Sequence, residues 1–140
     1  MNPVLVFDIE TVPDVQGIRR IRGVGSEVSD GDVAAMALQL RRQMVGHDFL
    51  PLHLQRVVVI SCALCDAETF KVWSLGGNSE EESEIIQRFF DGIEKYTPQL
   101  VSWNGTGFDM PVLHYRGLIH GVRAPRYWDT GDDDREFRFN

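Results

Sequence analysis

The alternation of apolar and polar residues predicts four strands and three helices. Apolar runs rich in β-branched and aromatic residues, bounded by turn-forming residues, are typical of strands, and apolar residues that recur every three or four positions are typical of helices. By these criteria, strands are predicted at residues 4–9, 56–64, 69–74 and 100–103. Helices are predicted at about residues 33–45, between Ser79 and Thr97, and from about 108 to 119.

The helix between Ser79 and Thr97 has the clearest pattern. The run Ser79-Glu80-Glu81-Glu82 matches a capping box at its start. One apolar face is formed by Ile85, Ile86, Phe89, Phe90 and Ile93. For the earlier helix, Val33, Met36, Ala37, Leu40 and Met44 recur at helical spacing and form the expected apolar face, and Asp30 or Asp32 is the expected cap. Residues 11–31, with four glycines and a proline, are expected to be loop.

The order of these elements predicts an α/β fold. Two strands joined by a short connection form a hairpin, and a helix then crosses over to another strand, which gives a mixed sheet flanked by helices. The length of 140 residues suits a single domain, with residues of about 11–56 as an insertion between the first two strands.

Composition narrows the possible functions. The content of 43% hydrophobic residues excludes a largely disordered chain, and the net charge of −7 argues against a protein that coats duplex nucleic acid with a broad basic surface. The charge is compatible with an enzyme that holds a few nucleotides through bound cations. No apolar run reaches the roughly 18 residues of a membrane span, and the N-terminus lacks the basic region of a signal peptide.

The two cysteines form a Cys-x-x-Cys pattern at Cys62 and Cys65. They lie in a predicted strand, where residues three apart point to opposite faces, and no second pair of metal ligands accompanies them. We therefore expect two buried, reduced thiols and a cytoplasmic protein.

Two acidic side chains end the first predicted strand. Asp8 and Glu10 are two residues apart and therefore share one face of the strand. Adjacent carboxylates repel each other, so a cation between them would explain the arrangement, although a strand that ends in solvent would explain it equally well.

A third acid, Asp109, follows a strand and a glycine-containing turn that also includes Asn104. Taken alone, Asp109 is more simply explained as a helix cap, and Asn104 as a turn residue.

Together, Asp8-x-Glu10-Thr11 and Asn104-x-x-x-Phe108-Asp109 resemble the first two motifs of the DEDD superfamily of 3'-5' exonucleases. The pattern is most similar to the exonuclease domains of family-B DNA polymerases and to the predicted exonucleases related to them. The resemblance implies a ribonuclease-H-like fold and covers nearly the whole chain.

The resemblance also implies roles for individual residues. Asp8, Glu10 and Asp109 would be catalytic ligands of two divalent cations, Mg²⁺ or Mn²⁺, with Asp8 shared between the ions. Thr11, Asn104 and Phe108 would contact the terminal nucleotide of single-stranded DNA, with RNA as a second possible substrate. Replication or repair proteins would be the partners. We expect Trp103 to belong to the core, since it continues an apolar strand.

The superfamily also has a fourth carboxylate, preceded by a Tyr or His that orients water. None is identified in the 31 residues after Asp109, and the acidic run at Asp132–Asp134 is expected to be loop. The sequence thus predicts an N-terminal portion of an exonuclease, without the fold's last strand and helix and with uncertain activity of its own.

Two other interpretations remain open. The chain could be a non-catalytic nucleic-acid-binding module, or a different metal-dependent phosphatase or phosphodiesterase. In the first case the candidate contacts are Arg19, Arg20, Arg22, Arg41 and Arg42.

Overall fold

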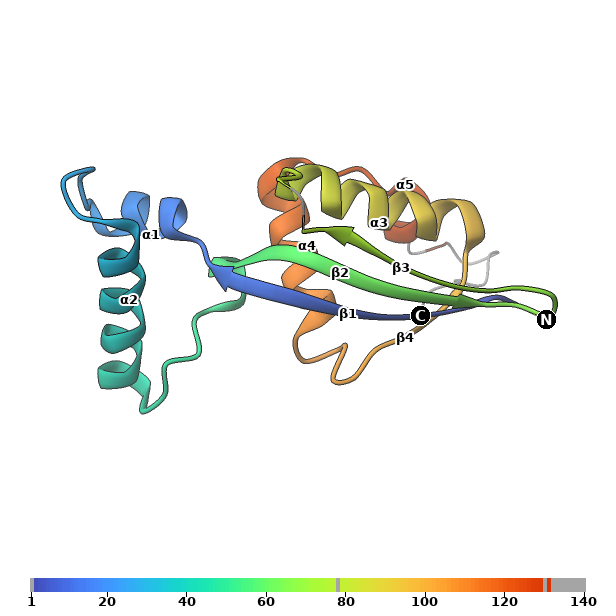
Figure 1. Cartoon of the computed structure of the whole chain (residues 1–140), viewed down its shortest axis with the longest axis horizontal. Helices are drawn as coiled ribbons and strands as arrows, with labels where there is room; N and C mark the ends of the chain where they lie inside the picture. The colour runs from blue at the N-terminus through green and yellow to red at the C-terminus, as the bar shows by residue number, and fades with distance from the viewer. Residues whose placement is uncertain (1, 78, 130, 132–140) are drawn as a thin grey trace. The chain divides into compact units, whose positions relative to one another are not determined.

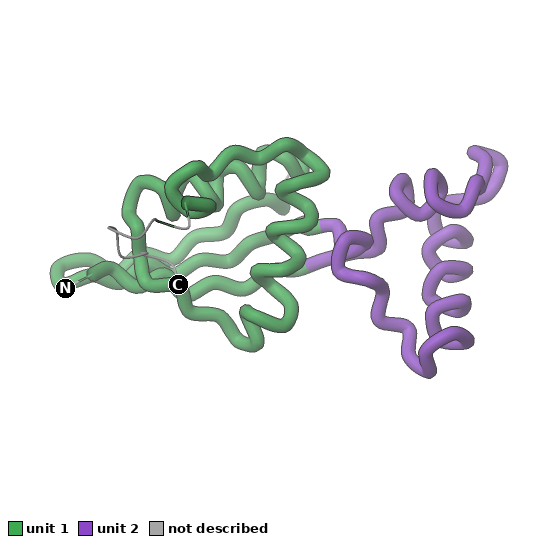
Figure 2. The backbone as a smooth tube through the Cα atoms, turned by 180° about the vertical axis from the view of Figure 1, so that it is seen from behind, with its two compact units in different colours: residues 1–10, 57–140 green, residues 11–56 purple. Residues whose placement is uncertain are grey.

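The computed structural model describes residues 2–77, 79–129 and 131. The chain divides into two compact units (Figure 2): unit 1 comprises residues 1–10 and 57–140, and unit 2 comprises residues 11–56. Each unit is described separately below. Whether residues 1–140 act as one domain with an insertion stays a prediction, as does the loop expected at Asp132–Asp134, which lies outside the described residues.

A four-stranded mixed sheet is the centre of the fold (Figure 1). It has the order β3-β2-β1-β4. The strands are β1 (Val4–Pro13), β2 (Gln55–Cys65), β3 (Phe70–Gly76) and β4 (Gln99–Val101). β1 and β4 are parallel, with Leu5 opposite Leu100, and β2 and β3 form the expected antiparallel hairpin, with Cys62 opposite Trp73. The mixed α/β sheet predicted from the sequence is therefore confirmed.

Unit 1 also contains three helices. They are α3 (Glu82–Tyr96), α4 (Asp109–His120) and α5 (Pro125–Trp128). Figure 1 shows α3 running along the sheet with α5 beside it, and α3 contacts both α4 and α5. The short helix α5 was not predicted, because Pro125 resembles a helix stop but instead occupies the first helical position, where its missing N–H costs nothing.

The core of unit 1 lies between one face of the sheet and α3. Alternate residues of β1 are buried, and Phe7 packs against Phe89 with ring centroids 5.0 Å apart. All five apolar residues predicted for the face of α3 are buried. The other residues of β1, from Val6 to Glu10, are exposed, so one sheet face forms the core and leaves the acidic face of β1 open.

The predicted capping box of α3 is wrong. Glu81, rather than Ser79, is the N-cap, and it makes no side-chain cap hydrogen bond. Glu82 is drawn instead into a buried ion pair with Arg116 of α4. A tertiary contact has therefore overridden the local capping pattern.

Unit 2 is helical. It contains α1 (Val15–Arg22), α2 (Asp30–Val45) and the short 3₁₀ helix η1 (Leu52–Leu54). α1 lies in the stretch expected to be loop, and its N-cap is Asp14, which accepts a hydrogen bond from the Gly17 N–H. α2 is capped by Ser29 and not by either aspartate.

The core of unit 2 is small, and it buries only part of the apolar face predicted for α2. Its buried members are Ile18, Val33, Ala37 and Leu50. Met44, expected on the same face, is 70% exposed.

Among the described helices of the chain, none combines the length and apolar character needed to cross a membrane.

Candidate nuclease site

The exposed face of β1 carries the first two candidate carboxylates. Leu5, Phe7 and Ile9 point into the core, so Asp8 and Glu10 both project from the opposite face into solvent. The two acids therefore share one face, as the sequence predicted. Because nothing covers them in the described part of unit 1, their oxygens are accessible to a ligand.

The third candidate, Asp109, is buried at the first position of α4. It is only 2% exposed, and its Oδ1 atom has no hydrogen-bond partner among the described residues. A buried carboxylate without a full set of partners is costly, because it has lost water without replacing it. Such a group needs an explanation beyond helix capping, and α4 gains no side-chain cap from its N-cap residue Phe108.

Charge and burial both act on Asp109. Burial raises the pKa of Asp109, and the negative charge of Asp8 raises it further. Ser102, whose buried Oγ lies near the carboxylate but also has no hydrogen-bond partner among the described residues, and the backbone N–H groups of Asp109 and Ile9 lower the pKa but do not offset the rise. The structure thus brings Asp109 within electrostatic reach of Asp8 and against the backbone of β1, as expected for two members of one site.

The turn between β4 and α4 sets where Asp109 lies. Asn104 adopts a left-handed conformation with φ of 56°, and its carbonyl accepts hydrogen bonds from the N–H groups of Gly107 and Phe108, each at 3.0 Å. A Cβ at Gly107 would approach Asn104 Oδ1 to 2.5 Å, so a side chain there would displace the amide. Asn104 and Gly107 together therefore allow the tight turn that delivers Asp109 to the start of α4.

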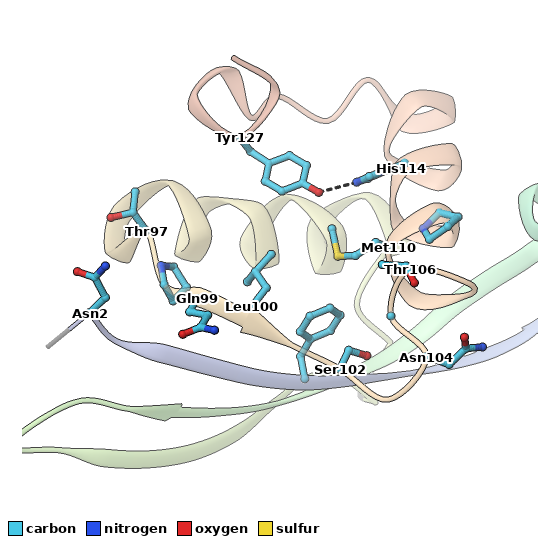
Figure 3. A pocket seen from close by; sticks show the side chains of 14 residues that line it. Asn2, Thr97, Gln99, Leu100, Ser102, Asn104, Thr106, Met110, His114 and Tyr127 are labelled. Carbon is cyan, nitrogen blue, oxygen red and sulfur yellow. Dashed lines mark hydrogen bonds between the residues drawn. The ribbon is translucent and has the colours of Figure 1, made fainter. Parts of the chain in front are cut away.

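A cavity of about 860 Å³ lies beside this turn in unit 1 (Figure 3). Residues on both sides of Asp109 in the sequence line it, namely Ser102, Asn104, Gly105, Thr106 and Met110. His114 and Tyr127 form another part of its wall, joined by a hydrogen bond of 2.7 Å that Figure 3 marks. Burial lowers the pKa of His114 and raises that of Tyr127, so both side chains are neutral near pH 7, and no Asp, Glu, Lys or Arg among the described residues lines the cavity.

The remaining predicted residues are placed as follows. Thr11 belongs to unit 2, where its hydroxyl donates to Gln55 Oε1 at 2.9 Å. Phe108 is the N-cap residue of α4 and is partly buried. Contact of Thr11, Asn104 or Phe108 with a nucleotide stays a prediction.

Two expectations about neighbouring residues are wrong. Trp103 is 93% exposed, because β4 ends at Val101 and the turn carries the indole out of the core. Cys62 is buried, which raises the pKa of its thiol to about 11, but Cys65 is exposed because it lies on the other face of β2.

The donor chemistry suits a hard cation. The three candidate acids offer carboxylate oxygens, the ligands that Mg²⁺ and Mn²⁺ prefer, and Asp109 Oδ1 has no competing partner among the described residues. Within that same part of the chain, no three His, Cys, Asp or Glu side chains lie close enough together to form a ready group of metal ligands. The roles of Asp8, Glu10 and Asp109 as ligands therefore stay a prediction.

Sequence reasoning missed the side chains that fix α4 in unit 1. Glu82 and Arg116 are 3% and 2% exposed, and Arg116 donates to Glu82 Oε1 through Nε at 2.8 Å and to Oε2 through Nη2 at 2.5 Å. His120 makes a further bond of 2.6 Å with Glu82 Oε2. The available signal was one turn of α4, where Arg116 lies among apolar residues and is followed by His120 four positions later.

A segment of the chain is similar to the catalytic subunits of two DNA polymerases. It is 41% identical over 46 residues to the DNA polymerase epsilon catalytic chain of Saccharomyces cerevisiae, over 32% of this chain and 2% of that protein. It is 32% identical over 62 residues to the protein of the same name from Dictyostelium discoideum, over 44% of this chain and 3% of that protein. The chain therefore matches only a small part of the length of these relatives.

A family model covers most of the chain. It is described as a predicted 3'-5' exonuclease related to the exonuclease domain of PolB, and it matches residues 47–140. The matched region includes Asn104 and Asp109 and excludes Asp8 and Glu10. On this match, the chain belongs to the family of predicted 3'-5' exonucleases related to the exonuclease domain of PolB.

Proposed function

We propose that unit 1 is a two-metal 3'-5' exonuclease module that hydrolyses phosphodiester bonds at the 3' ends of single-stranded DNA. The observation that carries the proposal is the buried Asp109 carboxylate, with one oxygen unpaired among the described residues and with the charge of Asp8 acting on it. Helix capping alone does not require a buried acid beside a second acid, whereas a cation site does.

In this proposal, Asp8, Glu10 and Asp109 hold two Mg²⁺ or Mn²⁺ ions, with Asp8 shared between them. When bound, such ions lower the pKa of a water and stabilise charge on the phosphate oxygens. The protein's own contribution is to keep the Asp109 carboxylate away from water and fixed at the start of α4. It also leaves the face of β1 that carries Asp8 and Glu10 open to the 3' end of the DNA.

The terminal nucleotide would be held by neutral groups. Asn104 lines the uncharged cavity beside the turn, and Thr11 and Phe108 adjoin the proposed ligands in the sequence. Uncharged amide, hydroxyl and aromatic groups bind bases and sugars without strong sequence preference. A role beside replication or repair proteins is supported by the similarity to polymerase catalytic chains.

Asp8→Ala tests the reaction. With a 5'-labelled single strand and Mn²⁺, the wild-type chain is expected to shorten the DNA from its 3' end only slowly, because no fourth carboxylate is identified in it, and Asp8→Ala is expected to abolish even this activity, because a shared ligand is lost. Asp66→Ala is the matched control, since Asp66 is a half-exposed acid whose side chain bonds only within its own turn, to the N–H groups of Glu68 and Thr69 and to the Thr69 hydroxyl. An equal rate for wild type and Asp8→Ala would exclude the role of Asp8.

A second function, nucleic-acid binding without cleavage, is favoured by the charge of unit 2. Residues 11–56 contain six arginines and five acids, although the whole chain has a charge of −7. The structure restricts which arginines are available. Arg19 donates to Gly25 O and Val28 O and pairs with Asp30, while Arg41 and Arg42 bond Phe49 O and Asp48.

Of the five arginines named as candidate contacts, Arg20 and Arg22 therefore remain the strongest for DNA contact in unit 2, since both are exposed and pair with no other side chain among the described residues. Arg20→Gln with Arg22→Gln is expected to weaken binding of single-stranded DNA severalfold. It should also reduce the slope of log K against log salt by about 1.4, the value for two phosphate contacts. Fluorescence anisotropy over a salt series measures both. Lys71→Gln with Arg123→Gln removes two exposed charges of unit 1, and an equal loss in that control would mean that only net charge matters.

A further inference from the structure

The carboxylate of Glu82 joins three elements of unit 1. It lies at the first position of α3 and is nearly fully buried. Its Oε1 atom accepts hydrogen bonds from the Val57 N–H of β2 at 2.7 Å and from Arg116 Nε of α4 at 2.8 Å. Its Oε2 atom bonds Arg116 Nη2 at 2.5 Å and His120 Nε2 at 2.6 Å. One side chain thus fixes α4 against both α3 and β2.

The start of α4 has little local support of its own. Its N-cap residue Phe108 provides no side-chain cap hydrogen bond, and Pro111 in the first turn has no N–H to donate. Backbone bonds from Met110 to Gly105 and from Val112 to Phe108 hold the turn together, but they do not set the rotation of the helix about its axis.

Arg116 can set that rotation. It follows Asp109 by seven residues, which is about two turns, so both side chains lie on nearly the same face of α4. The planar guanidinium fork meets a carboxylate in one geometry through two parallel bonds, and it therefore fixes the helix more narrowly than apolar packing does. Stability alone does not require this arrangement, because a buried ion pair is commonly no more stabilising than well-packed apolar residues of similar volume.

We propose that Arg116, held by Glu82, is a positioning residue for the candidate metal site. It fixes the rotation of α4 about its axis and the position of α4 against the sheet, so that the Asp109 carboxylate faces β1 beside Asp8. The inference rests on the proposed function, in which Asp109 is a metal ligand, and it adds that the affinity of the site depends on a charge network two helical turns away.

The test replaces the ion pair by a neutral pair. In Glu82→Gln with Arg116→Met, the Gln carbonyl can still accept from the Val57 N–H, and Met fills the space of the arginine stem, so the fold is expected to persist. The matched control is Glu80→Gln with Arg88→Met, because Glu80 and Arg88 form an ion pair of 2.6 Å at the exposed start of α3, where Glu80 also accepts from the Gly76 N–H.

Two measurements are made on the full chain. The affinity for Mn²⁺ alone, measured by electron paramagnetic resonance of the free ion, is expected to fall at least tenfold in the neutral-pair variant and to stay within twofold of wild type in the control. Without metal, amide hydrogen exchange at Val112 and Leu113 is expected to become at least tenfold faster in the neutral-pair variant only. Unchanged Mn²⁺ affinity and exchange in a folded neutral-pair variant would overturn the inference.

Arg116→Lys provides a second route if the neutral-pair variant does not fold. Lysine keeps the buried positive charge but cannot form the two-bond fork, so Mn²⁺ affinity is expected to fall, and wild-type affinity in this variant would overturn the inference. Failure of the proposed function gives a different result. In that case wild type would bind Mn²⁺ no better than Asp109→Ala, and both proposals would be rejected together.

Discussion

Glu82→Ala is expected to destabilise unit 1 by about 3–5 kcal/mol, the range measured when one partner of a buried ion pair is removed. The substitution removes the Glu82 carboxylate from the buried Arg116 guanidinium, and it removes the acceptor of the Val57 N–H. His120, with 28% of its side chain exposed, can still reach water and adds little to the loss. Urea unfolding followed by tryptophan fluorescence measures the change in the free energy of unfolding.

The pH dependence of this loss identifies its cause. Burial acts to raise the pKa of Glu82, but hydrogen bonds from Arg116, His120 and Val57 outweigh burial and lower the pKa below its ordinary value of 4.5. A carboxylate with a lowered pKa contributes stability above the unfolded-state value, and that contribution is lost as the pH falls through the folded-state pKa. The difference between wild type and Glu82→Ala should therefore be full at pH 7 and shrink below about pH 4.5.

Glu80→Ala is the control for this experiment. Its ion pair with Arg88 is partly exposed and contributes about 0–1 kcal/mol, and the lost acceptor of the Gly76 N–H adds about 0.5–1.5 kcal/mol, so the loss is expected to be clearly smaller than for Glu82→Ala. Equal losses for Glu80→Ala and Glu82→Ala, or a loss for Glu82→Ala that does not change with pH, would contradict the structural role assigned to Glu82.

The mixed sheet could be predicted because each strand carries its own signal. β1 alternates between buried and exposed residues, and the same alternation places Asp8 and Glu10 on one face. The hairpin of β2 and β3 follows from two apolar runs with a short connection. In these elements, local pattern and tertiary structure favour the same result, which is the condition under which sequence reasoning succeeds.

Sequence reasoning failed where a tertiary contact competes with a local pattern. The capping box at Ser79 was a strong local signal, but Glu82 forms a buried bond with a residue 34 positions later. Trp103 continues an apolar run, yet β4 ends two residues before it and the indole is exposed. The bond of Glu82 depends on a residue far along the chain, so it could not be read from a local window, whereas the exposure of Trp103 follows from the local turn, which the apolar run alone did not indicate.

The candidate site could be predicted only in part, because one of its acids lies far along the sequence from the other two. Asp8 and Glu10 are related by the strand repeat alone, whereas Asp109 is 99 residues after Glu10, and its position depends on the turn at Asn104. Only the combined motif suggested that these acids meet. Asp109 Oδ1 has no hydrogen-bond partner among the described residues, and this property of the folded chain most clearly separates a ligand from a helix cap.

Asp109→Asn is expected to stabilise the metal-free chain at pH 7, because it removes a buried negative charge whose pKa is raised by burial and by the charge of Asp8. The expected gain is on the order of 1 kcal/mol, since a tenfold change in the acid dissociation constant corresponds to about 1.4 kcal/mol. The competing effect is the favourable interaction of a negative charge with the start of α4, worth about 0.3–1 kcal/mol. The raised pKa of Asp109 indicates that burial and the charge of Asp8 outweigh that benefit in the folded chain. Removing the charge should therefore raise the midpoint of thermal unfolding measured in EDTA.

The stability contributed by Asp109 depends on pH with the opposite sign to the stability contributed by Glu82. A carboxylate with a raised folded-state pKa contributes stability below its unfolded-state value, near the ordinary value of 3.8, and this is lost as the pH rises through the folded-state pKa. The advantage of Asp109→Asn should thus be small at pH 3.8 and grow toward pH 7.

Divalent metal should reverse which of the two proteins, wild type or Asp109→Asn, is the more stable. At Mg²⁺ or Mn²⁺ concentrations about 100 times the dissociation constant, a folded-state ligand adds about 2.7 kcal/mol of stability. Wild type is expected to gain this and Asp109→Asn to gain little, so calorimetric scans with EDTA and with Mn²⁺ should give opposite rankings. Asp129→Asn, an exposed acid in the same unit, should behave as wild type in both. If Asp109→Asn were less stable in EDTA and responded to Mn²⁺ as wild type does, Asp109 would be a helix-capping residue, and the proposed metal site would lose its main support.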